Sequence, residues 1–143
     1  MRLEKLGKIE LTYTDVDDEL TYAEGGHVYG ILKGTLEAGD LSGTLHVTNI
    51  TRQRPDGAFT PTLRGMLTTP EGAKVFVTID GISILDPTAK PPRRIVTAGI
   101  SFWTPESRLH HWNDTYLVAE MVGRSTGKSW GVAGTVHRCI PEL

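Results

Sequence analysis

Two carboxylates alternate with apolar residues, in positions from which they could transfer protons. Glu120 shares one face of its predicted strand with Val118 and Val122, and Asp80 shares a face of its predicted strand with Phe76. An apolar pocket that shields a carboxyl group from water favours its protonated form, and two carboxyl groups in unlike surroundings can divide the roles of acid and base. The pattern predicts Glu120 and Asp80 as catalytic residues. In the alternative, each of them faces solvent and does no chemistry.

Two further polar side chains are candidates for binding and orienting a ligand. Arg64 stands in the middle of an apolar run, where its guanidinium could bind an anionic or carbonyl group if it pointed inward. Asn49 shares its face with Leu45 and Val47, whereas His46 lies on the opposite face. We therefore expect Asn49 to point inward, while Arg64 can face either the interior or solvent.

Aromatic and imidazole side chains are densest between positions 103 and 113. Trp103, His111, Trp112 and Asn113 are the residues in this region that could line the mouth of a pocket, with apolar surface and a titratable donor. The alternative is a short helix over 105–112 that plugs one end of the fold, with Trp112 in the core. The proline at 105 and the early glutamate suit such a helix or turn.

Other chemistries find no motif in the chain. Two adjacent histidines without a third ligand at a familiar spacing predict no metal site. The sequence has no phosphate-binding loop, no nucleophile elbow and no dinucleotide fingerprint, so we expect no cofactor and no covalent catalysis. The only cysteine, Cys139, cannot form an internal disulfide and is expected to be a half-buried small apolar residue.

Period-two alternation and glycine-marked turns place these residues on strands. The turn signals are Gly-Gly, Asp-Gly, Glu-Gly and Thr-Gly pairs, which tolerate the positive φ of tight hairpins. They separate about eight predicted strands, which span residues 8–14, 27–37, 41–54, 58–69, 73–84, 93–104, 116–124 and 128–138.

Long sequential strands with internal glycines predict an all-β fold, a single antiparallel barrel of meander type. We expect one domain over residues 1–143, with a short helix or turn near 105–112. The proline-containing segment 86–92 is the longest predicted loop and could cross one barrel mouth. Small closed barrels commonly hold one ligand, so this architecture would supply a container for the polar candidates.

One stretch resembles a known family. Residues 54–82, RPDGAFTPTLRGMLTTPEGAKVFVTIDGI, are similar to the middle of the bacterial domain-of-unknown-function 3237 proteins. Leu41-Ser42-Gly43 and the Thr-Thr-Pro-Glu-Gly-Ala turn at 68–73 follow that family's order, as do Phe102-Trp103-Thr104 and Trp112-Asn113. The family's Pro-Gly-Gly-x-Asp-Trp segment does not follow Gly43. The resemblance implies a small antiparallel barrel that self-associates, and it implies no established reaction.

Composition and charge argue against two classes of partner, nucleic acids and membranes. The 143 residues carry a formal net charge of −2 with no basic stripe, which disfavours nucleic-acid binding. The charge runs at 15–19 and 91–94 are interpreted as solvated loop edges. No run approaches the roughly 20 apolar residues of a membrane span, and the N-terminus lacks the apolar region of a signal peptide. We therefore expect a cytoplasmic protein with no membrane partner.

Three functions remain open from these observations. The first is binding of an apolar or aromatic metabolite in the barrel lumen, with a possible cofactor-independent isomerase, cyclase or lyase reaction. The second is a carrier or sensor without chemistry. The third is a structural homo-oligomer whose barrel is filled by its own side chains.

Overall fold

The computed structural model of the chain describes residues 1–14, 18–125, 127 and 129–143, and of Asp18 only the backbone. Its elements, in chain order, are β1 (Arg2–Tyr13), β2 (Asp18–Tyr22), β3 (Gly25–Ala38), β4 (Leu41–Gln53), β5 (Phe59–Thr60), β6 (Thr62–Thr68), β7 (Lys74–Asp86), β8 (Arg93–Trp103), the 3₁₀ helix η1 (Ser107–Asp114), β9 (Leu117–Ser125) and β10 (Trp130–Ile140).

Eight of these strands close into an antiparallel ring. The order around the ring is β3, β1, β10, β9, β8, β7, β6 and β4, and β4 pairs back to β3. The short strand β2 extends β3 beyond β1, and β5 bridges β4 and β7. Closure leaves the long strands without free edges, and it confirms the predicted antiparallel barrel of meander type.

Alternation along each strand divides interior from surface. In β4, Leu45, Val47 and Asn49 are buried, whereas the side chains between them are exposed. Inward-facing side chains from all eight ring strands form one apolar core, to which η1 adds Leu109 and Trp112. Strand pairing therefore defines the container, and the inward residues decide how much of it stays empty.

Glycine serves two purposes in this barrel. Gly39 and Gly72 occupy the turns after β3 and β6 with φ of 62° and 89°, which L side chains rarely adopt. Gly34 lets β3 lie close to β1, because an added Cβ would stand 1.7 Å from the carbonyl oxygen of Glu10. Bends and close approaches of this kind allow long strands to wrap around a narrow lumen.

The structure differs from the sequence prediction at strand ends, at the helix ends and in two short strands, β2 and β5, the second because the predicted strand 58–69 is divided into β5 and β6. β1 begins at Arg2 instead of position 8, and η1 covers Ser107–Asp114. The acidic run at 15–19 is predicted to be a solvated loop edge, but β2 begins at Asp18, because the backbone of Asp18 pairs with Tyr29 of β3. Residues 15–17, together with Thr126 and Lys128 of the predicted last turn and strand, lie outside the described part of the chain.

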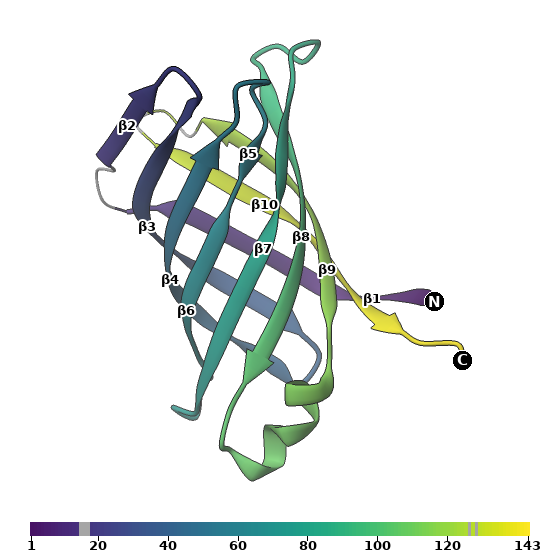
Figure 1. Cartoon of the computed structure of the whole chain (residues 1–143). Helices are drawn as coiled ribbons and strands as arrows, with labels where there is room; N and C mark the ends of the chain where they lie inside the picture. The colour runs from purple at the N-terminus through teal and green to yellow at the C-terminus, as the bar shows by residue number, and fades with distance from the viewer. Residues whose placement is uncertain (15–17, 126, 128) are drawn as a thin grey trace.

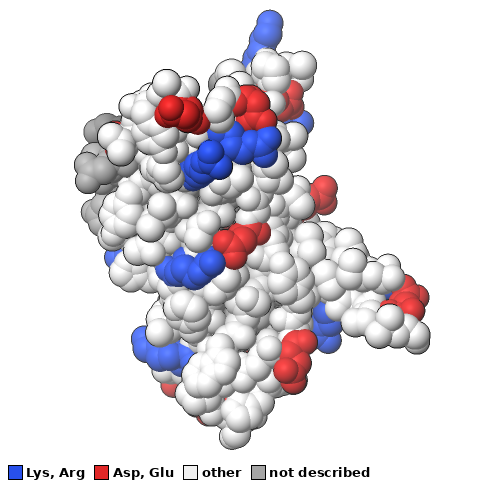
Figure 2. Space-filling view, in the orientation of Figure 1, with Lys and Arg blue, Asp and Glu red and all other residues white. Residues whose placement is uncertain are grey.

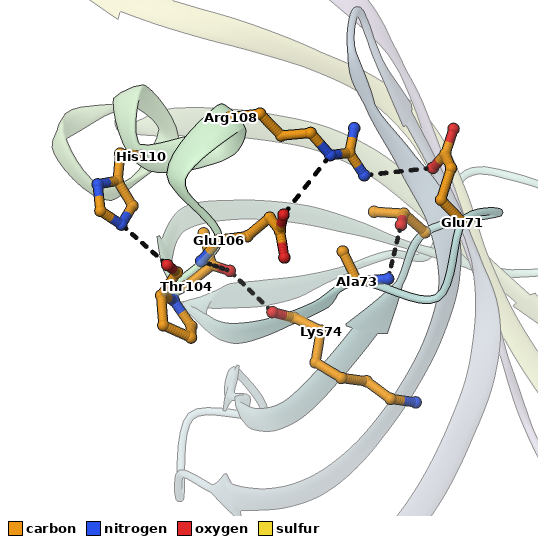
Figure 3. Close-up of polar contacts among 9 residues, drawn as sticks. Glu71, Ala73, Lys74, Thr104, Glu106, Arg108 and His110 are labelled. Carbon is orange, nitrogen blue, oxygen red and sulfur yellow. Dashed lines mark hydrogen bonds and ion pairs between the residues drawn. The ribbon is translucent and has the colours of Figure 1, made fainter.

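The helix η1 closes one end of the barrel. In Figure 1 it lies across the lower end, while the β2–β3 and β7–β8 hairpins rise at the upper end. One ion pair joins η1 to the β6–β7 turn, since Arg108 lies 3.5 Å from Glu71, and Arg108 also lies 3.8 Å from Glu106 at the start of η1 (Figure 3). Before η1, the Thr104 hydroxyl donates to the carbonyl oxygen of Lys74 at 2.9 Å. No described helix is long and apolar enough to cross a membrane.

Candidate functional site

Both predicted catalytic carboxylates lie on the outside of the barrel. Glu120 is exposed because its neighbours Ala119 and Met121 take the inward positions of β9. Asp80 is exposed for the same reason, since Ile79 is the inward residue of β7. The inward orientation on which their acid–base role depended is therefore wrong for both residues.

Arg64 also points outward, as a partner of Asp80. Its Nη1 and Nη2 donate to the two carboxylate oxygens of Asp80 at 3.2 and 3.1 Å, across β6 and β7. The adjacent Leu63 takes the inward position, which excludes Arg64 from the lumen. On the face shown in Figure 2, basic and acidic side chains lie beside one another without a large patch of one sign. The Arg64–Asp80 pair belongs to this surface pattern, not to a pocket.

The aromatic region at 103–113 seals the closed end of the barrel. Trp112 is fully buried and donates from Nε1 to Asp40 Oδ1 at 3.0 Å, and His111 lies 3.2 Å from the other oxygen of Asp40. Asn113 holds the start of the segment by accepting from the Thr104 N–H at 2.8 Å and donating to its carbonyl oxygen at 3.0 Å. Trp103 is 60% exposed on the outer face. The mouth-lining role expected for these four residues is wrong, and the plug alternative is confirmed.

Asn49 does point into the lumen. It is only 4% exposed, and its Nδ2 donates to the phenolic oxygen of Tyr13 at 2.6 Å. Its Oδ1 accepts from the backbone N–H of Thr62 at 3.3 Å. Both ends of the amide are therefore used, which fixes the side chain and orients Tyr13 beside it.

Beside Asn49, in the half of the barrel opposite η1, the lumen contains a cavity of about 980 Å³. Its walls are mainly apolar, and the apolar residues that line it include Leu11, Leu32, Leu63, Ile79, Val96 and Met121. Pro91 and Pro92, between β7 and β8, also line it. A lumen filled wholly by its own side chains, as in the structural alternative, is therefore excluded for this half of the barrel.

Neutral polar side chains interrupt the apolar wall, namely those of Tyr13, Thr14, Asn49, Thr51, Gln53, Ser83, Ser125 and Ser129. Tyr13, Asn49, Thr51 and Ser83 contribute neutral donors and acceptors, and Thr51 and Ser83 are buried. The charged residues among the described lining are Arg94 and Glu19. Glu19 is exposed and accepts a hydrogen bond from Gln53 Nε2 at 3.1 Å. Arg94 is the only cation among the described residues that line the cavity.

Arg94 is held firmly in place. Its Nε donates to Ser83 Oγ at 2.7 Å, and its Nη2 donates to the carbonyl oxygens of Gly57 and Ser83 at 2.9 Å each. The guanidinium carbon lies 3.8 Å from the centre of the Phe59 ring. Burial lowers the pKa of Arg94 below its usual value, because desolvation disfavours the charged form.

Sequence reasoning missed Arg94 because the Pro-Pro-Arg-Arg run was interpreted as a solvated loop edge. Arg93 fits that interpretation in part, since its Nε lies 2.9 Å from Asp86 Oδ2 in the hairpin. Arg94, by contrast, is in phase with the buried Val96 and Ala98 of β8. That alternation was the available signal, and it places the Arg94 side chain inside.

The arrangement can bind a small molecule, and it offers no paired carboxylates for acid–base chemistry. No described aspartate or histidine lines the cavity. Among the described residues, no group of three or more His, Cys, Asp or Glu side chains is placed to hold a metal ion.

Comparison with solved structures shows the same fold. A β-barrel like protein from Acinetobacter baumannii AYE superimposes with a TM-score of 0.80 at 19% identity, covering 96% of this chain and 94% of the other. A protein of unknown function from Clostridium acetobutylicum gives a TM-score of 0.78 at 15% identity, with 98% and 100% coverage.

A third similar structure is an enzyme from Penicillium herquei. Its TM-score is 0.61 at 14% identity, covering 94% of this chain and 93% of the enzyme. No protein-family profile matches the chain. No curated protein sequence matches it either. At these identities the likeness shows the fold alone.

Proposed function

We propose that the protein binds an apolar small molecule in the open half of its barrel. The observation that carries this proposal is the cavity of about 980 Å³, closed at one end by η1 and its packed core. Ligand sites are typically concave and largely apolar, of roughly 300–1,000 Å³, with a few polar groups that orient the ligand. Tyr13, Asn49, Thr51, Ser83 and Arg94 are those groups here.

A second candidate is cofactor-independent catalysis of the isomerase, cyclase or lyase kind. The observation that favours it is the Tyr13–Asn49 hydrogen bond of 2.6 Å beside the cavity, which aligns a phenol capable of proton transfer. Tyr13 and Arg94 replace Glu120 and Asp80 as the residues that such a reaction would use. The enzyme from Penicillium herquei supports the candidate only through its shared fold.

Relationship and assembly are further parts of the proposal. We propose that the chain is a relative of the domain-of-unknown-function 3237 proteins, and its antiparallel barrel supports this relationship.

The predicted homo-oligomer is supported by apolar side chains that lie side by side on the exposed outer face of β6, β7 and β8, namely Met66, Phe76 and Trp103.

Binding of a neutral aromatic probe tests the proposed function. N-phenyl-1-naphthylamine fluoresces strongly in apolar surroundings, and we expect it to bind the wild-type protein with saturable enhancement. Ala98→Phe places a ring in the lumen and should weaken binding by about 10-fold or more, since it occupies space that the probe needs. Thr97→Phe is the matched control, because the same ring then points outward from the same strand.

Two results would contradict the proposal. One is the absence of saturable binding by wild type. The other is equal binding by both phenylalanine variants, provided that each has the circular dichroism spectrum of the wild type, since the lumen would then not be the site.

A further inference from the structure

Arg94 is the arginine whose side chain lines the cavity, and its partners differ in charge from those of two neighbouring arginines. Arg54 forms an ion pair with Asp56, and Arg93 forms one with Asp86. Arg94 donates to neutral oxygens only, and no described carboxylate lies within ion-pair distance of it. Within the described part of the chain, its positive charge therefore has no carboxylate partner at the cavity wall.

Arg94 is half-buried, so its guanidinium is partly removed from water while no described carboxylate compensates its charge, and such partial desolvation costs free energy. The depressed pKa of Arg94 follows from the same loss of water. An anion from outside the chain would regain the lost electrostatic energy, because charge-assisted hydrogen bonds are strong in poorly hydrated sites.

The geometry of the guanidinium leaves room for that anion. The hydrogen bonds of Arg94 to described residues run through Nε and Nη2, and none to a described residue runs through Nη1. Ser83 and the Phe59 ring fix the plane of the group, so its remaining donors are already ordered. Ordered donors lose little entropy on binding a carboxylate.

The number of cations limits the kind of anion. Arg94 is the one cation among the described residues that line the cavity, and Glu19 adds a negative charge at the rim. A polyphosphate would need several positive groups, whereas one guanidinium matches one carboxylate. The rest of the wall is apolar or neutral, which suits a hydrocarbon or aromatic body.

We propose that the cavity takes a monoanionic ligand, an aromatic or aliphatic carboxylate whose acid group binds Arg94 and whose body fills the open half of the lumen. This inference rests on the proposed function, because it names the ligand class for the same cavity.

A pair of probes with one aromatic body separates the two proposals. N-phenyl-1-naphthylamine is neutral, and 1-anilinonaphthalene-8-sulfonate is the same body with an acid group. In Arg94→Gln we expect the affinity for the anionic probe to fall by about 10- to 100-fold, the range for loss of charged hydrogen bonds. The neutral probe should bind as it does to wild type. Arg93→Gln is the matched control and should alter neither affinity, since Arg93 is occupied by Asp86.

A folded Arg94→Gln protein that binds both probes as wild type does would overturn the inference. So would one that loses both affinities equally, because Arg94 would then only support the mouth through Gly57 and Ser83. Ala98→Phe should block both probes, which localises each of them to the lumen. If wild type binds neither probe, the proposed function fails, and the ligand class fails with it.

If Arg94→Gln does not fold, a measurement on wild type tests the proposed ligand class. Displacement of the neutral probe by 1-naphthoate and by 1-naphthylmethanol compares an acid with an alcohol on one ring system. The concentration of 1-naphthoate that displaces the probe should be lower than that of 1-naphthylmethanol by a factor of about 10 or more, as one charged hydrogen bond predicts. Equal displacement by the two compounds would overturn the inference.

Discussion

The two halves of the lumen are built from the same strands, yet one is solid and the other hollow. In the closed half, Leu36, Leu67, Leu117 and Trp112 are buried to 1% exposure or less. In the open half, the same strands surround a cavity of about 980 Å³. Inward side chains contribute to the contrast, because the β3–β4 and β7–β8 pairings run through both halves of the barrel.

Inward residues change character as each strand runs from the closed end to the open end. In β7, Val75, Val77 and Ile79 are followed by Gly81 and Ser83. Small and polar residues leave space where large apolar residues would fill it.

β4 and β9 repeat the change. In β4, Leu45 and Val47 give way to Asn49 and Thr51, and in β9 Met121 gives way to the small Gly123. The barrel thus separates stability, which resides in the packed half, from binding, which requires the space in the other.

The largest expected effect comes from one substitution made in each half of the same strand. Leu67 in β6 is 0% exposed in the closed half, and Leu63 is 7% exposed beside the cavity. Leu67→Ala should lower the free energy of unfolding by about 2–5 kcal/mol, because it opens a new void in a packed core. Leu63→Ala should cost less, since part of its surface already borders empty space. Urea unfolding of both variants measures the difference, and equal losses would remove the distinction between the halves.

Acid should loosen the hairpin at the open end. The Thr88 hydroxyl and the Arg93 guanidinium hold the pKa of Asp86 below its ordinary value of 3.8. A lowered folded-state pKa means that this contribution is complete above pH 3.8 and is lost as pH falls through the folded-state value. Asp86 is half-buried and its ion pair with Arg93 remains accessible to water, which makes this effect smaller than that of Leu67→Ala.

Comparison of wild type with Asp86→Asn at neutral pH and near pH 3 measures this contribution. Wild type should lose more stability on acidification than the variant, which has no carboxylate to protonate at this position. Glu10→Gln, an exposed change on β1, serves as the control. An equal acid loss in wild type and Asp86→Asn would show that the hairpin is held by other contacts.

The smallest effects should come from the outer face. Glu120→Gln and Asp80→Asn should each change the free energy of unfolding by about 1 kcal/mol or less, as exposed charges and ion pairs usually do. Neither variant should alter binding of the neutral naphthylamine probe, because neither side chain reaches the cavity. Loss of probe binding in either one would return these carboxylates to the candidate site.

How far the sequence predicted the site depended on the neighbours of each residue. Asn49 was placed correctly because Leu45 and Val47 mark one face of β4 as apolar, against His46 on the other. Glu120 was misplaced because β9 is apolar on both faces, with Val118 in phase with Glu120 and Ala119 out of phase. Alternation indicates a face only when the two faces differ.

The sequence alone determined the strands and their turns, because period-two alternation and glycine turns are local properties of the chain, and the run of long sequential strands predicted the antiparallel barrel. Only the tertiary structure decided which face of β9 is inside, which end η1 seals, and that Arg94 faces the cavity while Arg93 pairs with Asp86. These outcomes depend on closure of the ring, which brings together strands distant in sequence and assigns one face of each to the lumen.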